Sequence, residues 1–250
     1  MSQLKYPTAR KIVQSSYIDI FAALLILGVS IAKGFHGTIY QDGAMQFGIP
    51  ITELGAYVRN GAFPLGIVSV IAAIFSVLAT RLVGKQNNWG NIIGIITTIS
   101  SGVLDYLFGN HSAVITYPIT FMIHNLATYR WSQGARIKKR DIWYYVIIGI
   151  GMLIGFGLVY LGAYLFGGKT DNAFLITVSL GFGLSLGGNF CNAFKYEETW
   201  LSWVVYNIIN LVKNAMQFNI ANVAKYVFYL FNAAVTLFDW RFNGDAKPTT

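Results

Sequence analysis

The sequence contains little of the chemistry that enzymes and metal-binding proteins use. Only 11% of its 250 residues are charged, and it has three histidines and one cysteine. The single Cys191 excludes an intramolecular disulfide, and no zinc or haem spacing occurs. A nucleophile elbow, a phosphate-binding glycine loop and a pair of carboxylates are likewise missing from the apolar runs. These absences predict a protein that is not an enzyme and that uses no cofactor or metal.

A charged content this low also excludes an ordinary soluble domain, in which about 25% of residues are charged. The sequence is 55% hydrophobic and its mean hydropathy is +0.53, which is typical of a polytopic membrane protein. The formal net charge of +8 does not indicate a nucleic-acid partner, because the Lys and Arg residues lie in short connections between apolar runs. The lipid bilayer is the expected partner. The polar N-terminus has no signal-peptide cleavage site, so we expect no cleaved leader.

Eight apolar runs are candidates for transmembrane helices. The first, 17–32, carries Asp19 and is short for a bilayer that needs about 20 helical residues, so it spans only marginally. Residues 33–60, broken by glycines and Pro50, fit an external connection with a surface helix over 45–58. Seven clearer spans follow, at 62–80, 89–108, 113–129, 142–166, 173–194, 200–217 and 221–239. The predicted fold is an all-α membrane protein with eight transmembrane helices.

The basic residues predict the orientation of these spans. Placing the N-terminus in the cytoplasm puts thirteen Lys and Arg inside and only Lys33, Arg59 and Lys169 outside. An excess of positive charge marks cytoplasmic connections. We therefore expect both termini in the cytoplasm, with a cytoplasmic tail over 241–250 that includes Lys247.

A stripe of indoles and amides marks the run WLSWVVYNIINLVKNAMQ over 200–217. Its members are spaced alternately three and four residues apart, which places them on one helix face. They are Trp200, Trp203, Asn207, Asn210, Asn214 and Gln217. Indole faces bind flat or cationic rings and carboxamides both donate and accept, so the stripe favours a site for a sugar-like or nucleoside-like solute. The alternative is that the amides tie helices together and the tryptophans anchor the helix at the membrane interface.

The same stripe pattern occurs 109 residues earlier in the chain. There the equivalent positions are Asn91, Gly94, Thr98, Ser101 and Asp105. This offset also pairs Trp131 with Trp240. We interpret the chain as two three-helix units, 62–131 and 173–240, joined by a linker over 132–172 and preceded by an N-terminal helix and external connection over 1–61. Such repeats would be parallel, and transporters built from repeats bind their solute near the bilayer midplane between them.

The predicted solute site combines both stripes with the last span, where Tyr226 and Tyr229 lie on one side. Asp105 could be a counter-ion for a cationic solute, a partner for Lys213 or a proton site, since intramembrane carboxylates are costly; it could also reach interfacial water. The sequence contains no evident ion-coupling apparatus, so the solute is expected to run down its gradient. The predicted substrate-binding residues are Trp200, Trp203, Asn207, Asn210, Asn214, Gln217, Tyr226, Tyr229, Thr98, Ser101 and Asp105.

The residues over 62–240 resemble the bacterial PnuC transporters. The pattern WxxWxxxN at Trp200, Trp203 and Asn207 follows Glu197-Glu198, and a tyrosine-rich last span ends in Asp239-Trp240-Arg241. PnuC proteins are similar to SWEET transporters, with three helices, a linker helix and three more helices. The resemblance implies a homo-oligomer, expected to be a trimer, that takes up nicotinamide riboside, a form of vitamin B3 used for NAD biosynthesis. Uptake across the inner membrane would be facilitated diffusion, with cytoplasmic phosphorylation trapping the product.

Three alternatives stay open at this point. Relatives of similar sequence are thought to carry thiamine or riboflavin. A small-solute channel would conduct without saturating. A membrane-embedded enzyme would need a reactive group in the core, for which Asp105 and His124 are the only candidates.

Overall fold

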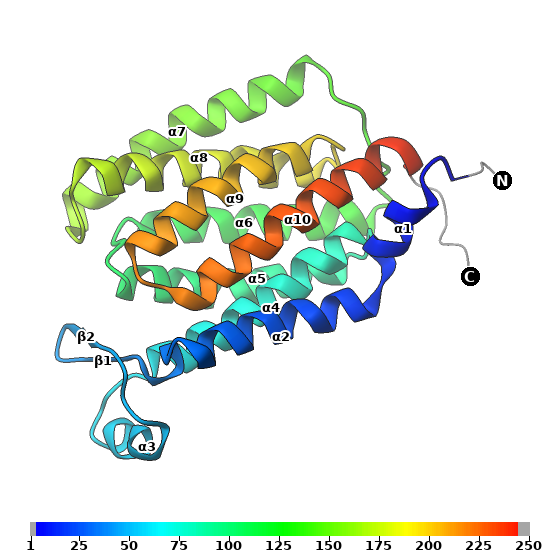
Figure 1. Ribbon diagram of the computed structural model, residues 1–250. Coiled ribbons are helices and arrows are strands. Elements are labelled where there is room, and N and C mark those ends of the chain that lie inside the picture. The colour runs from blue at the N-terminus through cyan, green and yellow to red at the C-terminus, as the bar shows by residue number, and fades with distance from the viewer. Residues whose placement is uncertain (1–3, 245–250) are drawn as a thin grey trace.

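Long helices form almost all of the computed structural model, which describes residues 4–244 (Figure 1). Residues 245–250 of the expected cytoplasmic tail, Lys247 among them, lie outside the described residues. In the described part, eight helices have 17 to 25 residues. They are α2 (Ser16–Ala32), α4 (Leu65–Gly84), α5 (Trp89–Leu107), α6 (Ala113–Ser132), α7 (Ile142–Phe166), α8 (Asn172–Ala193), α9 (Thr199–Met216) and α10 (Ile220–Asn243). Each coincides with one of the predicted apolar runs.

Five of these helices are long and apolar enough to cross a membrane: α4, α5, α7, α8 and α10. A sixth span is possible if α1 (Pro7–Gln14) and α2 count as one, because they meet at a bend of 55°. The remaining two, α6 and α9, are more polar; on α9 the amides of Asn207, Asn210 and Asn214 are buried inside the protein. The chain is a multi-pass helical membrane protein.

The external connection differs from the predicted surface helix over 45–58. Strands β1 (Ile39–Gln41) and β2 (Ala44–Gln46) form an antiparallel hairpin. Its turn has Asp42 and Gly43 at φ of 51° and 81°, the left-handed conformation that two-residue hairpins need. A short 3₁₀-helix, η1 (Phe35–Gly37), precedes the hairpin. Helix α3 (Ile51–Arg59) begins only after Pro50, because a proline disfavours helical geometry in the residue before it.

Six helices close into a ring. Consecutive neighbours α4, α5 and α6 pack together, α6 packs on α8, and α8, α9 and α10 lead back to α4. Helix α7 packs outside this ring against α6 and α8, and α2 packs outside it against α4 and α10. Figure 1 shows α7 and α2 on opposite sides of the bundle. The N-terminal helix therefore covers one junction between the two halves as the linker helix covers the other.

The turns of the two halves share an unusual backbone conformation at a constant spacing. Gln86 and Lys195 have φ of 62° and 57°, and Gly109 and Phe218 have φ of 96° and 56°. Both pairs are 109 residues apart. A positive φ is uncommon for a residue other than glycine, so these matching turns are strong support for an internal repeat.

Two tryptophans tie the halves together reciprocally. Trp131 at the end of α6 donates its indole N–H to the Asn192 carbonyl of α8 at 2.8 Å. Trp240 at the end of α10 donates to the Gly84 carbonyl of α4 at 2.9 Å. Each tryptophan thus links the third helix of one half to the first helix of the other half.

Buried arginines hold the N-terminal helices against the bundle. Asp19 of α2 accepts from Arg81 Nε of α4 at 2.6 Å. A terminal nitrogen of the Arg81 guanidinium donates to carbonyls at the α1–α2 bend, including that of Val13 at 2.8 Å. Arg10 of α1 pairs with Asp239 of α10, also at 2.8 Å. The charge of Asp19, which made the first run look marginal as a span, is therefore compensated inside the protein.

The connection before α7 supports the start of α9. The backbone N–H of Lys138 donates to the Lys195 carbonyl, and the N–H of Glu197 donates back to the Lys138 carbonyl. Asp141 caps α7 by accepting from the Tyr144 N–H. Hydrogen bonds from the Lys138 ammonium and the Tyr196 hydroxyl hold the pKa of Asp141 at about 2. Both segments are thereby joined immediately before the first tryptophan of the stripe.

Candidate functional site

A cavity of about 180 Å³ lies inside the ring and is lined by residues of all six ring helices. Every predicted site residue except Gln217 contributes to its lining. Those residues are Trp200, Trp203, Asn207, Asn210, Asn214, Tyr226, Tyr229, Thr98, Ser101 and Asp105. Gln217 lies beyond the cavity and donates its side-chain amide to Asp105 at 2.8 Å. The two stripes and the last span are thus brought to one enclosed space.

The amide face of α9 points into this cavity and its apolar face points away from the protein. Asn207 and Asn210 are each 3% exposed, whereas Ile208 and Val212 are 51% and 50% exposed. Asn210 donates to the Tyr206 carbonyl one turn earlier at 3.0 Å. Among the described residues nothing hydrogen-bonds to the carboxamide of Asn207. Because a buried amide without a partner is costly, Asn207 is a ready contact for a polar solute.

The two indoles of the stripe have different surroundings. Trp200 is fully buried and meets Trp203 and Trp240 edge-on, with ring centroids 4.7 Å and 5.6 Å away. Trp203 is half-buried and lies beside Gly188 of α8, where a Cβ would come within 3.0 Å of its indole nitrogen. Trp200 is therefore the support of an aromatic cluster, and Trp203 is the indole available to a ring in the cavity.

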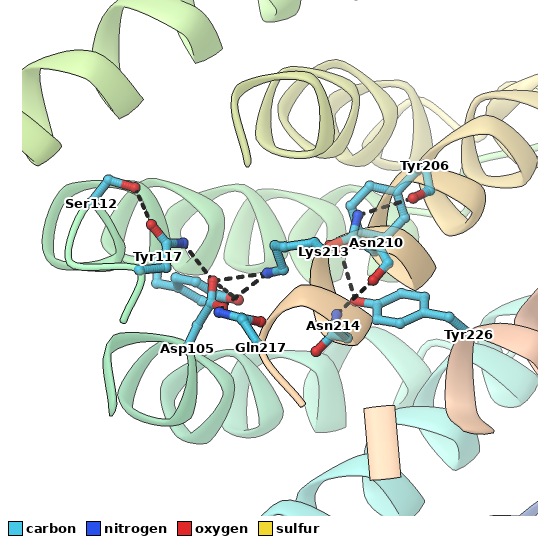
Figure 2. A network of polar contacts seen from close by, with 10 residues as sticks. Asp105, Ser112, Tyr117, Tyr206, Asn210, Lys213, Asn214, Gln217 and Tyr226 are labelled. Carbon is cyan, nitrogen blue, oxygen red and sulfur yellow. Dashed lines mark hydrogen bonds and ion pairs between the residues drawn. The ribbon is translucent and has the colours of Figure 1, made fainter. Parts of the chain in front are cut away.

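Asp105 is the centre of a buried polar network at one end of the cavity (Figure 2). Lys213 of α9 reaches across to α5 and contacts both carboxylate oxygens, at 2.9 Å and 3.0 Å. Asn110, Tyr117 and Gln217 also donate to the carboxylate, at 2.6 Å, 3.2 Å and 2.8 Å. At 7% exposed, Asp105 is not an interfacial acid reaching water. Of the roles open to it from the sequence, the structure displays the ion pair with Lys213.

The stripe of α5 presents small side chains whose polar groups are mostly used inside the protein. The Thr98 hydroxyl donates to the Gly94 carbonyl at 2.7 Å. Asn91 accepts from the side-chain amide of Asn192 at 3.0 Å, across the α5–α8 contact. Gly94 leaves room for His124 of α6, whose ring would lie 3.2 Å from a Cβ there. This side of the cavity provides space more than open hydrogen-bonding groups.

Helix α10 contributes residues that the sequence interpretation included and one that it missed. The Tyr229 hydroxyl donates to the Ser76 carbonyl of α4 at 2.6 Å, and the Tyr226 hydroxyl lies 3.3 Å from that of Tyr206. Lys225 also lines the cavity, with its ammonium 4.5 Å from the ring centroid of Tyr226. Its signal in the sequence was a lysine inside an apolar span, which by itself marks a functional candidate.

The glycines of α8 separate into two sets. A Cβ at Gly183 or Gly187 would lie within 2.9 Å of α7 backbone atoms, so these two let α7 and α8 pack closely, as the sequence predicts. Gly181 and Gly188 face α9 instead, where a Cβ would come within 3.1 Å of the Asn210 amide and 3.0 Å of the Trp203 indole. The second set leaves room for the stripe.

A bundle of long apolar helices around an enclosed polar cavity is the architecture of a membrane transporter for a small solute. The family model described as nicotinamide mononucleotide transporter matches residues 66–242, and the chain belongs to this family. The fold is also similar to a crystal structure of the vitamin B3 transporter PnuC, with a TM-score of 0.63 and 14% identity over 96% of this chain and 97% of that one. Among curated proteins there is no match. The predictions of a PnuC-type transporter and of a protein that is not an enzyme are confirmed.

Proposed function

We propose that this protein carries nicotinamide riboside by facilitated diffusion, with the solute bound in the cavity beside α9. The observation that carries this proposal is the free carboxamide of Asn207 next to the accessible indole of Trp203. Nicotinamide riboside has a cationic pyridinium ring, a carboxamide and a ribose. An indole face attracts the ring and a carboxamide pairs with the amide or the hydroxyls. The matched family and the similar crystal structure are both named for nicotinamide-type molecules, which supports this choice of solute.

Transport without a coupled ion is part of the proposal. Asp105 is the acid that lines the cavity, and its carboxylate already binds Lys213 and three neutral donors. A carboxylate engaged in this way is not available to carry a proton or sodium ion with each solute. Uptake is then driven by the solute gradient alone.

We also propose eight transmembrane helices in a three-plus-one-plus-three core with an added N-terminal helix. The support is the repeat of turn conformations and the reciprocal bonds of Trp131 and Trp240. Both termini would be cytoplasmic, in the inner membrane of a bacterium. Single cysteines at Ser132 and Asp42, both exposed, should then be labelled from opposite sides; labelling from the same side would contradict this topology. Native Cys191 is buried and should stay silent.

A trimer is proposed from the resemblance to the PnuC family. Light scattering of the detergent-solubilised protein, corrected for bound detergent, should give three copies of the 27.7 kDa chain. A mass of one copy would contradict this part of the proposal.

The solute is tested by titrating the purified protein with nicotinamide riboside, thiamine and riboflavin. We expect saturable binding of nicotinamide riboside, and saturable uptake into proteoliposomes that is unchanged when proton and sodium gradients are collapsed. Preference for thiamine or riboflavin would move the assignment to another vitamin. Uptake that does not saturate would favour a channel.

A further inference from the structure

We propose that Lys225 binds the oxygen-rich end of the transported solute, its sugar hydroxyls or a phosphate, and so determines which way the solute lies in the cavity. This inference rests on the proposed function. It concerns a residue of α10 that no part of the transport proposal above uses.

Lys225 is a buried ammonium with no acidic partner among the described residues. It is 5% exposed and lines the cavity. Its nitrogen lies over the rings of Tyr226 and Tyr229, 4.5 Å and 5.8 Å from their centroids. Within the same part of the chain no carboxylate or carbonyl accepts a hydrogen bond from it. Ring faces attract the charge but leave the three N–H groups of an ammonium unsatisfied.

Lys213, the other lysine of the cavity, shows the contrast. Its ammonium contacts both oxygens of Asp105, so that pair is neutral as a whole. Two ammonium groups against one carboxylate leave one positive charge uncompensated in the lining. A buried charge is costly unless a partner with oxygen acceptors approaches it. The solute is the partner that can enter this space.

The positions of Lys225 and Trp203 separate two ends of the cavity. Helices α9 and α10 are neighbours joined by a short turn. Lys225 lies near the start of α10 and Trp203 near the start of α9, so the two are separated by about 10 Å along the helix axes. A cationic ring is repelled by Lys225 and attracted by the indole, and both effects place it at the Trp203 end. The ribose, or a phosphate attached to it, then lies at the Lys225 end.

Three ligands measured on four proteins test this inference. The ligands are nicotinamide riboside, nicotinamide mononucleotide, and 1-methylnicotinamide, a cationic ring with the same carboxamide but no sugar. The proteins are the wild type, Lys225→Met, Lys225→Arg and, as a matched control, Lys33→Met at an exposed lysine outside the bundle. Binding is followed by calorimetry, and thermal unfolding is recorded for each protein.

We expect Lys225→Met to weaken nicotinamide riboside about tenfold and to leave 1-methylnicotinamide unchanged or bound more tightly. Lys225→Arg and Lys33→Met should stay within about threefold of wild type. A larger loss for the mononucleotide than for the riboside would identify phosphate as the preferred group, and equal losses would identify the sugar hydroxyls.

Two results would overturn the inference while leaving the proposed function intact: unchanged riboside binding in Lys225→Met, or an equal loss for 1-methylnicotinamide. The second would mean that Lys225 only shapes the cavity. Thermal unfolding guards against a folding artefact, because replacing an unpaired buried charge with Met should not lower the melting temperature. Failure of the wild type to bind any of the three ligands would instead refute the proposed function, and this inference with it.

Discussion

Helices α5 and α9 occupy equivalent places in the two halves, yet they bring different chemistry to the cavity. At equivalent positions α5 has Gly94 and Thr98 where α9 has Trp203 and Asn207. Each of these two pairs is separated by 109 residues, the spacing that also relates the turns. The small side chains of one helix make room for a solute that the large side chains of the other can hold. An internal repeat therefore does not imply two equal half-sites.

The hydrogen bonds of the two helices follow the same division. Thr98 uses its hydroxyl on the Gly94 carbonyl, and Asp105 uses its carboxylate on Lys213. Asn207 keeps its carboxamide free of partners among the described residues. We infer that α5 contributes mainly to folding and α9 mainly to solute affinity.

The largest effect is expected from breaking the ion pair that joins the two helices. Lys213→Met leaves the carboxylate of Asp105 buried without its counter-charge. Loss of one partner of a buried pair typically costs about 3–5 kcal/mol of folding stability. Thermal and denaturant unfolding of the detergent-solubilised protein would measure it. The double variant Asp105→Asn with Lys213→Met should recover most of the loss, and a single variant as stable as wild type would contradict the structural role.

A large effect on affinity is expected at the indole that faces the cavity. Trp203→Ala should lose about 1–3 kcal/mol of binding, near tenfold to a hundredfold in affinity, and Trp203→Phe should lose less because it keeps a ring. Isothermal titration with nicotinamide riboside measures both. If the stripe only held helices together, Trp203→Ala would lower the melting temperature while the affinity of the folded protein stayed within about twofold.

The smallest effects are expected on the opposite face of α9. The sequence suggests that its apolar residues stabilise the fold, but Ile208 is 51% exposed and Val212 is 50% exposed. Lipid surrounds such side chains in either state, so Ile208→Ala should change both melting temperature and affinity only slightly. A tenfold loss of affinity in Ile208→Ala would show that the division between the two faces is wrong.

Helix boundaries were largely predictable because long apolar runs leave few alternatives in a membrane. The linker helix was predicted at 142–166 and lies at Ile142–Phe166. The helix predicted at 62–80 instead runs over Leu65–Gly84. It continues past Arg81 because that charge is compensated by Asp19 and by the side-chain carbonyl of Asn232, contacts made with other helices.

The site was only partly predictable for the same reason. Helical periodicity identified the stripe of α9, but it treated Trp200 and Trp203 alike, and only packing against Trp240 distinguishes the buried indole from the accessible one. The partners of Asp105 on α6 and in the turn before it, such as Tyr117 and Asn110, depend on how helices cross. One helix face read alone does not contain that information.

The most direct test compares one pair of equivalent positions, Asn207 on α9 and Thr98 on α5, by calorimetric titration with nicotinamide riboside. Asn207→Ala should weaken binding by about tenfold to a hundredfold, because a polar group of the solute is left unpaired in a dry site. Thr98→Ala should stay within about threefold, because its hydroxyl already serves the Gly94 carbonyl. Equal losses at the two positions, or an unchanged affinity in Asn207→Ala, would contradict the assignment of solute binding to α9.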